Sequence, residues 1–149
     1  MNRPFVAENT RERERLRALV NRLSDGDLRL DIGGGWTIAA ALAHLAFWDC
    51  LSLTRIGQWK QSGVSASSVD IDVVNAALLP FLLSIPPRKA ADLAIAAAEA
   101  IDHELGQLSP EMIAAIESLG DRRRLFRSIH RAMHLDQIEE GLTGLGHSR

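Results

Sequence analysis

Two histidines in the C-terminal part of the chain, His130 and His134, are spaced for a shared role. They lie in the stretch 125–140, LFRSIHRAMHLDQIEE, where neither Gly nor Pro interrupts the helical recurrence of apolar residues. Residues four apart on a helix share one face, with Cβ atoms about 5–6 Å apart, so both imidazoles can point at the same spot. Imidazole is a ligand of many transition metals. The pair therefore predicts a ligand site, provided that the fold supplies a third partner.

Apolar side chains flank the histidine pair on both sides of the expected helix. The two stripes are Phe126, Ile129 and Met133 on one side, and Leu135, Ile138 and Leu142 on the other. We expect these stripes to pack and to hold the pair inside the protein. The second stripe could instead pair two copies of the chain, so a homodimer is a further expectation.

A third candidate ligand is His44, the single ionisable group of the apolar segment 37–48. A polar ring in such a stretch needs a partner. The other two histidines are weaker candidates. His103 lies between two acidic residues, where we expect exposure, and His147 lies in the Gly-rich end of the chain.

Three imidazoles on two helices could supply three ligands of a tetrahedral or octahedral ion. Such a site keeps positions open for water or substrate, as catalytic metal sites do. The ligand type alone does not choose among zinc, nickel, iron and copper. Hydrogen-bonded core histidines, or a pair exposed at a rim, are compatible with the same spacing. The zinc-protease pattern is absent, because Arg131 rather than Glu follows His130.

The elements that must position these histidines are all predicted to be helices. The expected helices cover residues 7–23, 38–60, 70–84 with an interruption at Pro80, 88–108, a short segment to 119, and 125–140. No segment shows the alternation of a strand. We expect one all-α domain over 1–149: a four-helix bundle with a long interrupted crossover between its second and third helices. Residues after Glu140 are expected to form a flexible tail.

Composition bounds the possible partners. The chain has 149 residues, 46% hydrophobic and 24% charged, with a formal net charge of −2, so no basic surface field favours nucleic acid. No apolar run approaches the ~20 residues of a membrane span, and the N-terminus lacks the apolar core of a signal peptide, so a cytoplasmic protein is expected. Cys50, the single cysteine, is expected to be buried and inert.

Several short motifs together resemble the DinB-like superfamily, which includes the metal-binding N-terminal domain of mycothiol-dependent maleylpyruvate isomerase. The matching elements are Trp36-Thr37, His44-Leu45, DVVN at 72–75 and HRAMHLDQI at 130–138. Each is short, but their order and separation are those of the superfamily. The resemblance extends from the first expected helix to Glu140 and implies a helical bundle with a divalent metal, usually Zn or Ni, held by His44, His130 and His134.

The resemblance also suggests an activity. It implies a metal-dependent transferase or isomerase that uses an external low-molecular-weight thiol on a small-molecule substrate. Metal-assisted hydrolysis and a non-catalytic metal-binding or interaction bundle are the alternatives. Four side chains could line an apolar pocket beside the metal: Trp36, Trp48, Phe126 and Met133. Cys50 is six residues from His44 and points away from it around the helix, so we expect no internal thiol nucleophile.

Overall fold

The computed structural model describes the backbone of residues 3–147 and the side chains as far as residue 144. Within this part every extended regular element is a helix, as predicted, and one isolated bridge joins Asp31 to Thr37. The helices are α1 (Pro4–Arg22), α2 (Asp25–Leu28), α3 (Ile38–Ser62), α4 (Ile71–Leu83), α5 (Pro87–Gly106), α6 (Pro110–Glu117), the 3-10 helix η1 (Arg122–Arg124) and α7 (Arg127–His147). None of the described helices is long and apolar enough to cross a membrane.

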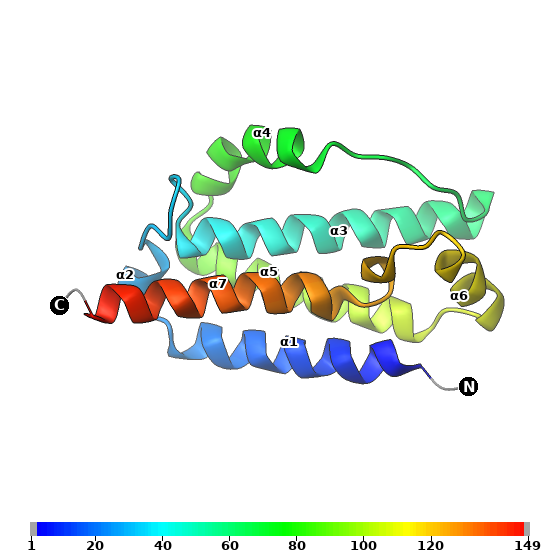
Figure 1. Ribbon diagram of the computed structural model, residues 1–149, viewed down its shortest axis with the longest axis horizontal. Helices are drawn as coiled ribbons and strands as arrows, with labels where there is room; N and C mark the ends of the chain where they lie inside the picture. The colour runs from blue at the N-terminus through cyan, green and yellow to red at the C-terminus, as the bar shows by residue number, and fades with distance from the viewer. Residues whose placement is uncertain (1–2, 148–149) are drawn as a thin grey trace.

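Four long helices, α1, α3, α5 and α7, run side by side along the long axis of the molecule (Figure 1). Their contacts close a ring, because α5 packs against α1 and α3, and α7 packs against the same two helices. Each contributes side chains that are at most 1% exposed, among them Leu16, Leu42, Ala94 and Leu135. Helix α4 lies outside the ring, against α3.

The start of α3 is fixed by local signals. The hydroxyl of Thr37 accepts a hydrogen bond of 3.0 Å from the backbone N–H of Ala40 and so caps the helix. Three successive glycines before it, residues 33–35, have positive φ angles that other residues rarely adopt. They reverse the chain between Asp31 and Thr37, which the bridge joins. This loop places Trp36 and the first turn of α3 at one end of the molecule.

The predicted interruption at Pro80 is wrong, because α4 continues through it from Ile71 to Leu83. Proline lacks the N–H that would bond the carbonyl of Ala76, four residues earlier. Ala76 and Pro80 are both exposed, so water can bond the freed carbonyl. A break in a helix is therefore not required here.

Two predictions about burial are also wrong. Cys50 is exposed, because it lies on the outer side of α3. Its thiol is nevertheless unreactive in character, since partial burial and the neighbouring Asp49 raise its pKa. The first apolar stripe of α7 does not pack as expected: Ile129 is 39% and Met133 49% exposed.

The second apolar stripe of α7 is core. Leu135 and Ile138 are completely buried, and α7 packs against α1 along its length. This stripe is therefore unavailable for contact with a second copy of the chain. The homodimer remains a prediction, but the surface that suggested it is buried within the chain.

Helix α7 continues beyond Glu140, where we expected a tail, to His147. The final residues of that tail, 148–149, lie outside the described part of the chain. Gly141 does not end the helix but allows a close approach. A Cβ atom on it would lie 2.6 Å from Cγ2 of Ile32 in the loop before α3. The glycine thus lets α7 contact the loop that carries Trp36.

We predict that Gly141→Ala lowers the free energy of unfolding by about 1–3 kcal/mol, because the added methyl group overpacks against Ile32. Gly57→Ala is the matched control. Gly57 is exposed within α3 and has no atom within 4 Å of an added Cβ, so alanine should stabilise by about 0.5–1 kcal/mol. Urea unfolding measures both, and the same sign for the two variants would contradict the close-approach role.

Candidate metal centre

The structure brings the three candidate histidines together. His44 projects from α3, and His130 and His134 project from successive turns of α7. The ring centroids are 5.2 Å apart for His44 and His130, and 4.7 Å apart for each of the other two pairs. One ring nitrogen from each residue lies within 4.8 Å of the other two. The i,i+4 spacing and the position of α3 beside α7 create this cluster.

The donor set fits a transition-metal ion. His44 is 4% exposed, and its buried Nδ1 atom makes no hydrogen bond of normal geometry with any described residue. A buried polar atom without a partner carries a free-energy cost that a ligand would remove. Donors around one tetrahedral zinc ion lie about 3.4 Å apart at ordinary Zn–N distances. Small side-chain rotations would therefore bring these nitrogens into place.

All three imidazoles are held in the neutral form that metal ligation requires. Burial lowers the pKa of His44 to about 4, assisted by repulsion from His134 and opposed by a polar contact with Asn75. Burial and then repulsion from His134 lower the pKa of His130 to about 2, with Arg127 contributing. The pKa of His134 is lowered by burial as well. Desolvation is the common cause.

His134 has its own orienting partner on the next turn of α7. Its Nδ1 atom lies 2.9 Å from Oε1 of Gln137. The amide oxygen can only accept, so Nδ1 carries the proton and the Nε2 lone pair is left free. Metal-ligating histidines are typically oriented by such a contact from the other ring nitrogen.

A cavity of about 770 Å³ opens beside the histidines, lined by residues of the loop before α3 and of α3, α4 and α7. His44 and His134 are among its walls, together with Trp36, whose ring meets that of His44 edge to face at 5.5 Å. Its size suits a small-molecule ligand. Two carboxylates, Asp72 and Glu140, also line it.

The predicted apolar lining is only partly correct. Trp36 lines the cavity, but Met133 is half exposed and Phe126 packs against Phe5 at the opposite end of the core. Trp48 acts differently: its Nε1–H donates to Oδ1 of Asn75 at 2.9 Å and so ties α3 to α4.

A buried ion cluster lies beside the histidines and links the helices that carry them. Arg131, 1% exposed, donates two hydrogen bonds of 2.8 Å to Asp102 on α5 and one of 3.3 Å to Asp49 on α3. Arg127 donates to the same Asp49 at 2.9 Å. Arg13 of α1 completes the cluster by donating to Asp102 at 2.7 Å. The cluster thus fixes α7, which carries two histidines, against α3, which carries the third.

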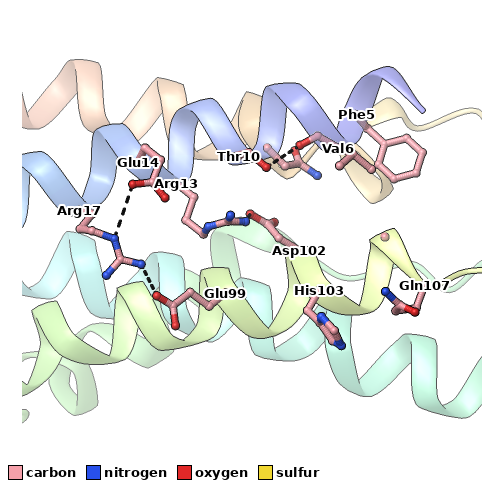
Figure 2. A pocket seen from close by; sticks show the side chains of 12 residues that line it. Phe5, Val6, Thr10, Arg13, Glu14, Arg17, Glu99, Asp102, His103 and Gln107 are labelled. Atoms are coloured by element: carbon pink, nitrogen blue, oxygen red, sulfur yellow. Dashed lines mark hydrogen bonds and ion pairs between the residues drawn. The ribbon is translucent and has the colours of Figure 1, made fainter. Parts of the chain in front are cut away.

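A second depression, of about 500 Å³, lies between α1 and α5, away from the histidine cluster. Figure 2 shows Arg13 directed at Asp102, and Arg17 placed between Glu14 and Glu99. The groove is open, and its arginines already have carboxylate partners. His103 lines it and is exposed, as predicted. We therefore assign no chemical role to this groove.

Sequence reasoning missed the residues that support the histidines. Asp49 lies five residues past His44 on α3, and it anchors α7 by accepting hydrogen bonds from Arg127 and Arg131. A signal was present in Arg127 and Arg131, two charges four residues apart on one face of the expected helix. Asn75 and Gln137 fall inside the motifs DVVN and HLDQI, but their contacts depend on how α4 and α7 lie against α3.

Comparison with known proteins identifies the family. The model of the DinB superfamily matches residues 8–140, and the chain therefore belongs to this superfamily. No curated protein matches the chain. No solved structure matches it either.

The lowered histidine pKa values predict that the metal-free protein is destabilised by acid. Below about pH 6.5 the histidines of the unfolded chain bind protons, whereas the buried imidazoles of the folded protein stay neutral. The free energy of unfolding therefore falls as pH drops from 7.5 to 5. His130→Gln should flatten this dependence, whereas His103→Gln, at an exposed site, should leave it unchanged. Urea unfolding with a chelator present measures the slope. Equal slopes in wild type and His130→Gln would refute the burial of a neutral imidazole.

The ion cluster predicts a large effect at Arg131. Arg131→Met leaves Asp49 and Asp102 buried with one partner fewer, and should lower the free energy of unfolding by about 3 kcal/mol or more. Arg11→Met, on the exposed side of α1, should change it by less than about 0.5 kcal/mol. Denaturant unfolding compares the two. Similar small losses would show that the cluster does not hold the helices.

Proposed function

We propose that His44, His130 and His134 bind one divalent metal ion, zinc or nickel, and that this member of the DinB superfamily uses it to activate an external thiol. The observation that carries the proposal is the meeting of three neutral imidazoles from two helices, two of which, His44 and His134, line a cavity. We also regard the four long helices as a four-helix bundle, because their contacts close a ring. Helix α4 and the loop before it form the crossover between α3 and α5.

The ion would supply Lewis acidity, which lowers the pKa of a thiol and keeps it as a thiolate at neutral pH. The residues of the chain would position the ligands and shield the site. Gln137 fixes the ring of His134, and the ion cluster around Arg131 fixes α7 against α3. Trp36 covers His44 from the side of the loop. The thiol must come from outside, since the thiol of Cys50 lies on the exposed side of α3.

Metal-assisted hydrolysis is the second candidate. The observation in its favour is that Asp72 and Glu140 line the same cavity, where a carboxylate could accept a proton from an attacking water molecule. Neither residue was expected near the histidines from the sequence. The two activities differ in one requirement: only thiol transfer or isomerisation depends on an added thiol.

Metal binding is tested first. Protein dialysed against zinc or nickel should retain about one ion per chain by elemental analysis. His44→Ala and His134→Ala should each weaken metal binding by more than about tenfold. Loss of a residue that merely orients a metal ligand already lowers metal affinity by about tenfold or more. His103→Ala is the matched control and should retain the wild-type content.

The alternatives are separated by the same proteins. A wild-type protein that retains no ion and shows no thermal shift with zinc or nickel would support a non-catalytic bundle and contradict the proposal. Turnover of an electrophilic substrate that is independent of added thiol would favour hydrolysis.

A further inference from the structure

The rim of the cavity beside the histidines has a distinct charge. Asp72 of α4 and Glu140 of α7 line it, together with the amide side chains of Asn75 and Gln137. Neither lysine nor arginine occurs among these described lining residues. Arg127 lies three residues before His130 on α7, but it is buried and paired with Asp49. A ligand in the cavity therefore meets carboxylates and amides rather than a cation of the protein.

A second, independent observation on the same cavity points to a ligand. His44 lines it, is 4% exposed, and has a buried Nδ1 atom without a hydrogen-bond partner among the described residues. The carboxylates are thus at the rim of a cavity whose wall includes His44, which has one nitrogen without a hydrogen-bond partner in the part of the chain that the structure describes. They are not an isolated acidic patch on the surface.

We propose that this cavity selects a thiol whose tail is uncharged or cationic, and that Asp72 and Glu140 disfavour a tail bearing a carboxylate, phosphate or sulfonate. This inference rests on the proposed function, because it concerns the thiol that the metal site would activate. The charge of the ion acts on the sulfur atom, which lies next to it. The rim carboxylates act on the remainder of the molecule.

The expected size of the selection follows from Coulomb's law. Two exposed carboxylates several ångströms from a charged tail each contribute a fraction of a kcal/mol in a mostly aqueous dielectric, attractive for a cation and repulsive for an anion. Replacing a cationic tail by an anionic one of equal length should therefore change affinity about tenfold at low salt. Trp36 adds an aromatic face on the same cavity, which also favours a cation.

The test uses three thiols with the same two-carbon spacer and no strongly chelating second group. They are 2-mercaptoethyltrimethylammonium, 2-mercaptoethanol and 2-mercaptoethanesulfonate. Each is titrated into the cobalt-loaded full chain, and the sulfur-to-cobalt charge-transfer absorption reports binding. The Asp72→Asn/Glu140→Gln double variant is compared with wild type. Asp92→Asn, on the exposed side of α5, is the control for loss of one negative charge elsewhere.

The deciding quantity is the affinity ratio of the cationic to the anionic thiol. Differences in the acidity of the thiols cancel when this ratio is compared between proteins. We expect the ratio to fall about tenfold in the double variant, to stay unchanged in Asp92→Asn, and to shrink in wild type at high salt. The cobalt spectrum without thiol should be the same in all three proteins, which shows that the variants fold.

Each of the other possible outcomes contradicts one specific proposal. An unchanged ratio in the double variant contradicts the inference about the tail but leaves metal binding and thiol activation standing. Cobalt binding with no charge-transfer band for any thiol contradicts thiol activation, and the inference with it. Failure of wild type to bind cobalt contradicts the proposed metal site itself.

Discussion

Arg131 is buried at the centre of the molecule, and its pairing determines how the long helices lie against one another. From α7 its guanidinium reaches Asp49 of α3 and Asp102 of α5, and Asp102 is also paired with Arg13 of α1. A buried charge that lost these partners would be costly, so the four helices have little freedom to slide. The residue before Arg131 is His130, and Asp49 lies five residues after His44. The ion cluster therefore also sets where the histidines meet.

Two buried polar clusters lie side by side and differ in one respect. The charges around Arg131 are paired within the protein: four ion pairs join three arginines to two carboxylates, although Nε of Arg131 has no hydrogen-bond partner among the described residues. The three imidazoles are crowded and neutral, and His44 keeps a nitrogen without a partner among the described residues. Paired charges of this kind serve structure, whereas neutral imidazoles at the wall of a cavity, without an ionic partner among the described residues, are available to a ligand. This contrast is the physical basis for assigning chemistry to the histidines.

Much of the helical architecture and the histidine cluster could be predicted from the sequence, because both depend on periodic patterns. The i,i+4 pair and the isolated polar ring of His44 needed only helical geometry. Predictions failed where tertiary contact decides the outcome. A flexible tail was expected after Glu140, but α7 continues, and its Gly141 is small enough for α7 to approach Ile32. Cys50 was taken as core, although the burial pattern of α3 changes along its length. The carboxylates of the cavity, Asp72 and Glu140, belong to segments whose meeting no local pattern reveals.

The proposed function requires that three imidazoles of this chain surround one metal ion. X-ray absorption spectroscopy of the zinc-loaded protein tests it most directly. We predict a first shell of light atoms at about 2.0–2.1 Å, with the multiple-scattering pattern of three imidazole rings. The wild-type pattern should lose one ring in His44→Ala. A spectrum with one imidazole or none, or one that is unchanged by loss of His44, would contradict the metal centre on which the proposed function rests.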